Sequence, residues 1–376
     1  MKYLVCLFFL ASVSARFTDD VYQILAKENA EQNIISSPLS LEIVMAMVYM
    51  GAKGNTAKEL QTVLKLPEDR NQVAKKYREF FTNLEGREKD AILELANRIY
   101  INDQLRLLPE YNKIVGDSFK AEAVPINVGN PQSAAATINS WVSRQTRNKI
   151  TKIVSAESIN RDFMAIIINA IYFKGVWKYK FVKEDTRKKD FHTSSNEKIP
   201  VDMMYLEGSF LADHFSDLDA KVLELPYRNS KLFMQIFLPN RIDGLSKLES
   251  QIGGFSRPLR KQDVYVRIPK FKIEFEKSLD GLLAKLGIKA AFSGAANFSG
   301  LVKDNLQISK VLQKGFVEVN EEGAEAAVVT ASNFIKICSH CPDNGPHPMI
   351  FTANHPFAFL IRDRETIYFQ GHIVRP

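Results

Sequence analysis

The segment from Phe163 to Phe173 most constrains how this chain can fold, because it is almost wholly apolar. A strand with one face in water alternates polar and apolar residues, whereas a strand covered on both faces does not. The run therefore predicts a strand inside a sheet that is covered on both faces.

The chain before this segment has the periodicity of helices. Ser37 followed by Pro38 supplies a capping hydroxyl and a proline, which predicts a helix that ends at Gly51. The residues Thr56-Ala57-Lys58-Glu59 fit a capping box at the start of the next helix. Apolar residues also recur at helical spacing near the N-terminus, at Phe17, Val21, Ile24 and Leu25.

The chain after this segment has the patterns of strands. Between Phe271 and Phe275 apolar residues alternate with charged ones, which predicts a strand with one wet face. Phe357–Ile361 and Ile367–Phe369 predict a closing pair of buried strands. Helices followed by strands indicate an α+β architecture. Neither an internal repeat nor a low-complexity linker interrupts the chain, so we expect one continuous domain over residues 16–376.

The first fifteen residues have the layout of a secretory signal peptide, with a positive charge at Lys2, a short apolar run, and small residues up to Ala15. The run is far shorter than the roughly 20 residues that span a bilayer. We therefore expect cleavage after Ala15, a secreted extracellular protein and no membrane anchor. Removing residues 1–15 takes away Lys2 and Cys6, so two cysteines stay in the mature chain.

The charge of the chain raises the question of polyanionic partners. The formal net charge is +7, and basic residues gather between Arg144 and Lys152 and again between Arg187 and Lys189. Acidic residues interleave with the second group, and no nucleic-acid motif accompanies either one. We expect a solvated basic face and no binding of nucleic acid. Weak polyanion binding stays open as a hypothesis.

Five blocks of sequence, spread over nearly the whole mature chain, resemble the serpin family in composition and order. They are Asn33–Ser40, Ala96–Tyr100, Ile138–Val142, Asn169–Trp177 and Asn354–Ile361. The resemblance implies an α+β serpin fold with three β-sheets, about nine helices and an exposed reactive-centre loop at about 323–350. It also implies a serine-protease inhibitor that works once: a protease cuts the loop, and the loop then enters the central sheet as a new strand.

The segment before this loop resembles a serpin hinge. Alternation with period two assigns Ala324, Ala326, Val328 and Thr330 to the core face, and all four are small or β-branched. No proline or large charged residue blocks that face before Lys336. An alanine-rich helix or surface loop is the alternative interpretation. The hinge comprises Glu321, Glu322, Gly323, Ala324, Glu325, Ala326, Ala327, Val328, Val329 and Thr330.

The family spacing, counted from Gly323, places the reactive bond between Ile337 and Cys338. The alternative bond joins Lys336 to Ile337. An isoleucine suits an elastase-like protease and a lysine suits a trypsin-like one, so both extracellular partners stay open.

The loop is long after this point and contains two cysteines, Cys338 and Cys341. In a secreted protein they form either a small disulfide or free thiols. Zinc binding is disfavoured because a second ligand cluster is lacking. We expect no metal and no cofactor.

By the same resemblance, Ser37, Ser40, Asn169 and Gln313 belong to the region where the sheet opens. Many serpins have histidine at the position of Gln313, and glutamine cannot titrate. Trp177 is expected near the top of the opening, and Lys270 is expected to pair with Glu321; core packing explains these residue types about equally well.

A non-inhibitory serpin that acts as a carrier or as a protease substrate is the alternative. An enzyme is excluded, since the chain lacks the HExxH, GxxxxGK[ST] and GxSxG motifs. We expect a monomer. The sequon at Asn297 lies in a segment that we expect to be packed.

Overall fold

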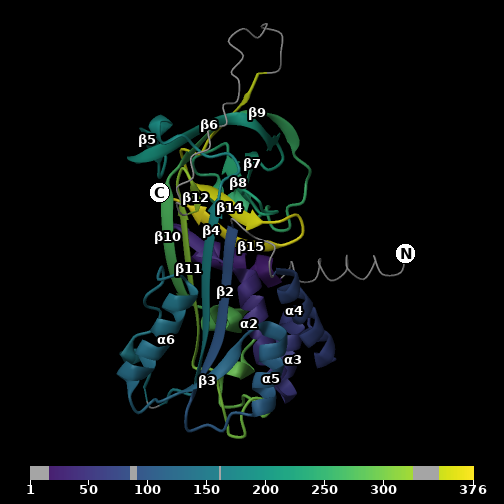
Figure 1. Ribbon diagram of the computed structural model, residues 1–376. Helices are drawn as coiled ribbons and strands as arrows, with labels where there is room; N and C mark the ends of the chain where they lie inside the picture. The colour runs from purple at the N-terminus through teal and green to yellow at the C-terminus, as the bar shows by residue number, and fades with distance from the viewer. Residues whose placement is uncertain (1–16, 85–90, 161, 325–346) are drawn as a thin grey trace, which may run out of the picture.

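The computed structural model describes residues 17–84, 91–160, 162–324 and 347–376 (Figure 1). None of the helices in these ranges is long and apolar enough to cross a membrane. Helical residues occupy 17–28, followed by α2 (Pro38–Gly51), α3 (Gly54–Leu64), α4 (Arg70–Leu84), α5 (Pro109–Phe119), α6 (Pro131–Gln145), α7 (Leu245–Glu249) and α8 (Asp280–Lys285).

The strands outnumber the helices in the second half of the chain. They are β1 (Ile34–Ser36), β2 (Ala91–Asn102), β3 (Glu122–Ile126), β4 (Ala165–Val176), β5 (Arg187–His192), β6 (Lys198–Phe215), β7 (Ala220–Pro226), β8 (Phe233–Pro239), β9 (Arg260–Pro269), β10 (Phe271–Ser278), β11 (Lys310–Val319), β12 (Gly323–Ala324), β13 (Met349–Thr352), β14 (Phe357–Arg362) and β15 (Ile367–Ile373). The predicted α+β architecture is confirmed.

A six-stranded sheet runs along the molecule in the order β10-β11-β4-β2-β3, and β12 pairs with the upper end of β4 (Figure 1). β4 is antiparallel to β2 and parallel to β11. It is buried along almost its entire length, as the apolar run predicted.

The two faces of β4 belong to two different cores. Ile167 and Ile171 lie in the large core that includes α2, whereas Ile168 and Tyr172 lie in a second core beneath α6. Trp141 of α6 contributes to that second core. The side-chain alternation of the strand therefore sends odd-numbered residues toward α2 and even-numbered residues toward α6.

The remaining strands form one nine-stranded sheet, so the described strands make two hydrogen-bonded sheets rather than the expected three. The reason is the length of β6. Its first part pairs with β5 and β9, and its last part, from Leu211 to Phe215, pairs with β7. One continuous strand thus joins two groups of strands that the resemblance treats as separate sheets.

The predicted helix start at Ser37 is confirmed, because its side chain accepts a hydrogen bond from the backbone N–H of Ser40 at 3.1 Å. The predicted capping box at Thr56 is wrong, since α3 begins at Gly54. Tertiary contacts occupy both side chains: Thr56 Oγ1 accepts from the N–H of Asn297, and Glu59 Oε2 accepts from that of Lys289.

Candidate functional site

Buried polar side chains gather at the middle of the six-stranded sheet, where β4 meets β11. Gln313 and Asn169 are direct neighbours across these strands. Gln313 Nε2 donates to Asn169 Oδ1 at 2.6 Å, and Ser36 Oγ donates to Gln313 Oε1 at 2.6 Å. Asn169 Nδ2 lies 2.6 Å from Ser40 Oγ and 2.5 Å from Asn97 Oδ1.

This network ties both strands to one end of α2. Gln313 Nε2 also reaches the carbonyl of Ser37 at 3.3 Å. The side chains of Ser40, Asn169 and Gln313 are at most 1 % exposed, so their hydrogen bonds cannot be replaced by water without opening the core. An unmade buried hydrogen bond costs about 1–3 kcal/mol. Separating β4 from β11 therefore breaks a set of coupled contacts.

The residues that follow β11 make a second cluster at the top of the same sheet. Trp177 Nε1 donates to the carbonyl of Asn320 at 3.0 Å, and its backbone N–H donates to the carbonyl of Glu322 at 3.0 Å. The indole ring stacks on Tyr227 at 4.6 Å between centroids. Lys180 forms an ion pair with Glu322.

Glu321 is the buried acid of this upper cluster. Lys270 Nζ lies 3.1 Å from its Oε2, and Thr186 Oγ1 donates to its Oε1 at 2.9 Å. Burial would raise the pKa of Glu321, but backbone and Thr186 hydrogen bonds together with Lys270 hold it below its ordinary value. The carboxylate is therefore charged at neutral pH and fixes the end of β11.

The chain turns at Gly323 in a conformation that suits only glycine. Its φ is +132°, and a Cβ there would lie 2.8 Å from the backbone nitrogen of Trp177 and closer still to the carbonyl of Gly175. Glycine lets the backbone approach β4 and pair with Val176.

Lys314 joins β11 to two other parts of the molecule. Its ammonium lies 2.8 Å from Glu274 Oε1 and 3.1 Å from Glu276 Oε2, both on β10. It also donates to the carbonyl of Lys152, in the connection between α6 and β4, at 2.8 Å. Burial would lower the pKa of Lys314, but hydrogen bonds to the two carboxylates raise it above its ordinary value.

The structure thus brings Ser37, Ser40, Asn169 and Gln313 into one cluster, and Trp177, Lys270, Glu321 and Glu322 into another. The remaining hinge residues from Glu325 to Thr330, both reactive-bond alternatives, and Cys338 and Cys341 lie outside the described residues. The chain resumes at residue 347, and β13 begins at Met349.

Sequence reasoning missed Ser36, Asn97 and Lys314. Asn97 was visible within the Ala96–Tyr100 block, but nothing in the sequence shows that its side chain reaches Asn169. Lys314 stands beside Gln313 in a strand that is buried along most of its length, and a buried lysine of that kind needs partners.

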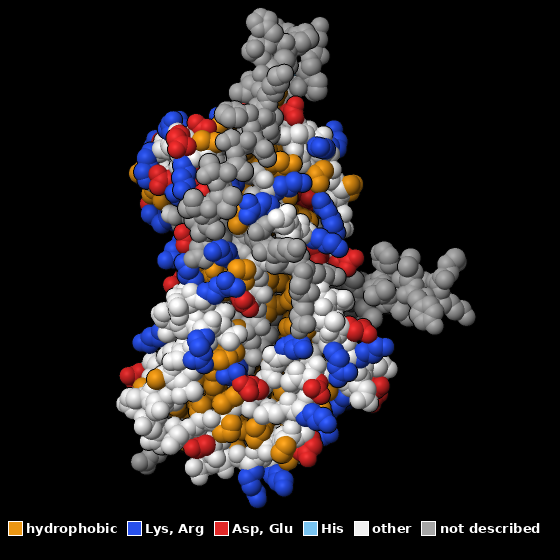
Figure 2. All heavy atoms as spheres, in the orientation of Figure 1, with side chains coloured by type: hydrophobic (Ala, Val, Ile, Leu, Met, Phe, Trp, Pro, Cys, Tyr) orange, Lys and Arg blue, Asp and Glu red, His pale blue; other side chains and the backbone are white. Residues whose placement is uncertain are grey.

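Two further predictions concern the surface. Asn297 is exposed and only its neighbour Phe298 is buried, so the expectation that this sequon is packed is wrong for the asparagine itself. In the second basic group Lys188 pairs with Asp202, and the neighbouring Asp190 pairs with Lys198. On the face shown in Figure 2, basic and acidic side chains are interspersed.

No group of three or more His, Cys, Asp or Glu side chains that could hold a metal ion occurs within the described ranges. The two clusters consist of amides, hydroxyls, ion pairs and one indole. Such an arrangement can fasten strands to each other and release them.

Comparison with known proteins agrees with this geometry. The family model described as "Serpin (serine protease inhibitor)" matches residues 12–376. The chain is 46 % identical to Serine protease inhibitor 42Dd of Drosophila melanogaster, with 100 % of both chains covered. It is 35 % identical to human Leukocyte elastase inhibitor, with 98 % of this chain and 99 % of that protein covered.

Solved structures show the same fold. The crystal structure of Serpin48 from the insect Tenebrio molitor superposes with a TM-score of 0.88 at 34 % identity, and the match covers 98 % of each chain. Human thyroxine-binding globulin complexed with its hormone superposes with a TM-score of 0.88 at 25 % identity, over 98 % of this chain and 99 % of that one. With the family model, the curated relatives and the fold in agreement, the chain belongs to the serpin family.

Proposed function

We propose that this serpin is a secreted inhibitor of an extracellular serine protease, and that it acts by inserting its cleaved loop between β4 and β11. One observation carries the proposal. The pairing of β4 with β11 ends at Tyr172 and Phe316, and above that point Gly323 and Ala324 pair with Val176 and Gly175 of β4. The first hinge residues therefore occupy the place where a new strand would begin.

The direction of this pairing also supports insertion. β12 is antiparallel to β4, and β4 is parallel to β11. A strand that continues β12 would run antiparallel to both neighbours, which permits a regular ladder on each side. The insertion would require the two strands to separate by about one strand spacing, about 4.8 Å.

The register of β12 fixes where each later hinge residue would go. Ala324 faces Gly175, so continued pairing would place Ala326 opposite Phe173 and Thr330 opposite Asn169. These odd-numbered residues of β4 face the core that includes α2. The register thus agrees with the alternation that assigned the even-numbered hinge residues to the core face.

The reaction itself would use the protease's catalytic serine. The serine hydroxyl would attack the carbonyl carbon of Ile337, or of Lys336 in the alternative, and the peptide nitrogen of the following residue would leave with a proton. The acyl ester would then travel with the inserting strand before water can hydrolyse it. The name of the relative Leukocyte elastase inhibitor favours the Ile337–Cys338 bond and an elastase-like target.

The experiment is incubation with trypsin-, chymotrypsin-, elastase- and subtilisin-type proteases, followed by denaturing gels and mass spectrometry of the released peptide. A complex that survives denaturation supports inhibition, and the peptide mass identifies the bond. Complete cleavage with no complex and no gain in thermal stability would instead support the alternative, a non-inhibitory serpin that serves as carrier or substrate.

Secretion needs its own test, because residues 1–16 lie outside the described ranges. The full chain should be exported by insect cells and recovered from the medium with Arg16 as its first residue. Retention in the cells with an intact N-terminus would contradict secretion without bearing on inhibition.

A further inference from the structure

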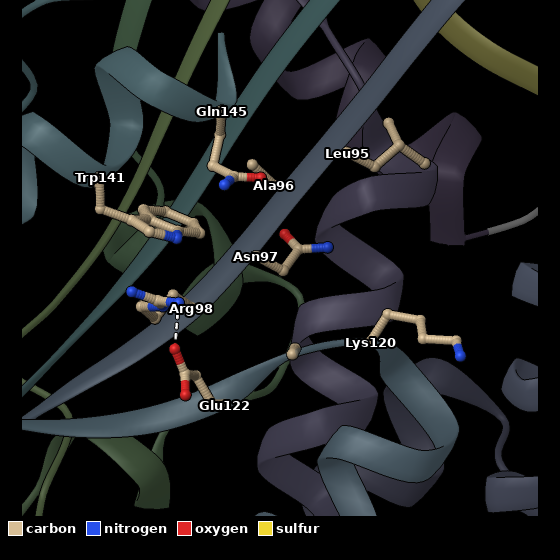
Figure 3. Close-up of a pocket in the computed structure, with 9 residues that line it drawn as sticks. Leu95, Ala96, Asn97, Arg98, Lys120, Glu122, Trp141 and Gln145 are labelled. Carbon is tan, nitrogen blue, oxygen red and sulfur yellow. Dashed lines mark hydrogen bonds and ion pairs between the residues drawn. The ribbon is translucent and has the colours of Figure 1, made fainter.

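Two features of the described residues could hold another molecule. One is a cavity of about 350 Å³ beside β2, α6 and β3, where Arg98 and Glu122 in the walls form an ion pair with each other (Figure 3). The other is Asn297-Phe298-Ser299, the one N-glycosylation sequon of the chain, which lies between η3 (Ala290–Phe292) and β11. The charged side chains of the cavity, which also include Lys120, have partners within the protein, whereas the sequon presents an exposed amide.

The three residues of the sequon alternate between solvent and core. Phe298 is 2 % exposed and belongs to the core that includes α2. Asn297 and Ser299 on either side of it are exposed. The middle residue therefore anchors the segment, and the two outer residues, which a glycosylating enzyme must recognise, lie on the surface.

The backbone of Asn297 is held against the start of α3. Its N–H donates to Thr56 Oγ1 at 3.0 Å, and its carbonyl accepts from the backbone N–H of Lys53 at 2.8 Å. Three residues further on, the N–H of Gly300 donates to the carbonyl of Gly51 at 3.0 Å. These contacts fix the path of the chain, so the Asn297 side chain is held at the surface by the fold itself.

The side-chain amide of Asn297 uses its oxygen for local contacts and leaves its nitrogen available. Oδ1 accepts from the backbone N–H of Ser299 at 3.2 Å and from Ser299 Oγ at 2.8 Å. Nδ2 has no hydrogen-bond partner in the part of the chain that the structure describes. A Cβ at Gly54 would lie 3.7 Å from Nδ2, so glycine at that position leaves room beside the nitrogen.

We propose that Asn297 carries an N-linked oligosaccharide, a modification that rests on the proposed secretion. The transfer joins Nδ2 to the anomeric carbon of an oligosaccharide that arrives as a lipid-linked pyrophosphate. The lipid pyrophosphate leaves, and Nδ2 gives up one proton. The sugar then extends from the start of α3, which lies in the lower half of Figure 1, whereas β12 lies in the upper half. It therefore leaves β12 and the hinge uncovered.

Asn305 provides a matched control in the same connection. It is also exposed and is also followed by a buried apolar residue, Leu306, which is 3 % exposed. Gln307 stands where the sequon has its hydroxyl residue, so Asn305 shares the exposure of Asn297 without being an acceptor.

The test is expression of the full chain in insect cells, followed by mass spectrometry of the denatured protein before and after digestion with a peptide N-glycosidase. We expect the mass of residues 16–376 plus one oligosaccharide, and loss of that increment on digestion, which leaves an aspartate in the peptide that contained Asn297. Asn297→Gln and Ser299→Ala should each abolish the increment, whereas Ser299→Thr and Asn305→Gln should keep it. Because the readout uses denatured protein from medium and cells alike, it applies even to a variant that folds poorly.

Glycosylation and secretion are separated by replacing residues 1–15 with an export signal of known function. An unmodified Asn297 in chain exported by either signal, or in all chain made with the replacement signal, would overturn the site. A glycan that is gained only with the replacement signal would support the site and contradict the proposed secretion. A mass increment that persists in Asn297→Gln, or that is lost in Asn305→Gln, would place the sugar elsewhere and would also overturn the proposal.

Discussion

If the proposed inhibitory function holds, moving one carboxylate by one residue should convert this serpin from an inhibitor into a substrate. The register of β12 would place Glu325 opposite Lys174 on the outer face of β4 and Ala326 opposite Phe173 on the inner face. Phe173 is 1 % exposed, and its ring lies 4.9 Å from that of Tyr227 and 5.9 Å from that of Phe369. The double variant Glu325→Ala, Ala326→Glu keeps the net charge and points the carboxylate into these rings.

The cost of that change follows from the protonation of the buried group. A glutamate with an ordinary pKa of about 4.3 can avoid burial as an anion by taking up a proton, which costs about 4 kcal/mol at pH 7. If half of this cost is present in the transition state of insertion, the rate falls by about 30-fold. Deacylation would then precede insertion in most encounters.

The assay is the stoichiometry of inhibition at pH 7.4 together with the ratio of complex to cleaved chain on denaturing gels. Glu325→Gln removes the charge at its original place and should inhibit nearly as well as the wild type, because exposed ion pairs contribute only about 0–1 kcal/mol. Ala326→Met controls for side-chain size. Wild-type stoichiometry in the double variant would refute the register and the inner-face assignment.

Three further predictions rest on other contacts. Lys314→Met removes the ammonium that Glu274 and Glu276 of β10 share, so it should lower the free energy of unfolding by about 1–3 kcal/mol in urea titrations. An unchanged urea midpoint of unfolding would contradict the stabilising role of this ion pair. Burial, with a smaller contribution from a neighbouring acid, raises the pKa of Asp19 from 3.8 to about 6, so this group destabilises the fold as pH rises through that window. Asp19→Asn should therefore stabilise the fold by about 1–3 kcal/mol at pH 7.5, seen as a higher melting temperature, and should have no such effect near pH 4. An equal rise in melting temperature at pH 7.5 and pH 4 would show that ionisation of the carboxyl is not the cause. If Cys338 and Cys341 form a disulfide, a protease that cuts between them leaves the two fragments joined on non-reducing gels, whereas a cut before Cys338 allows insertion. If the gels with and without reductant are identical after a cut between the two cysteines, the cysteines are free thiols.

Local patterns predicted much of the fold. The apolar run predicted β4 as a strand buried on both faces, and the alternation from Phe271 to Phe275 predicted β10 with one exposed face. These predictions succeed because the side-chain period of a strand is a local property of the backbone. The cap at Ser37 succeeds for the same reason, since donor and acceptor lie three residues apart.

Predictions failed where distant residues compete for a side chain or a strand. Thr56 and Glu59 have the spacing of a capping box, yet Asn297 and Lys289 take up their oxygens. The count of sheets likewise depends on whether β6 bends or continues, which its partners β5, β7 and β9 determine together. Neither outcome can be found from the spacing of neighbours.

The sequence by itself determined the family, the α+β composition and the alternation of the hinge, because these follow from motif order and from local periodicity. The tertiary structure alone decided that Gln313, Asn169 and Asn97 share one network and that Gly323 already pairs with β4. Residues far apart in the chain meet there only through packing, and hydrogen bonds between them depend on distances that no local pattern encodes.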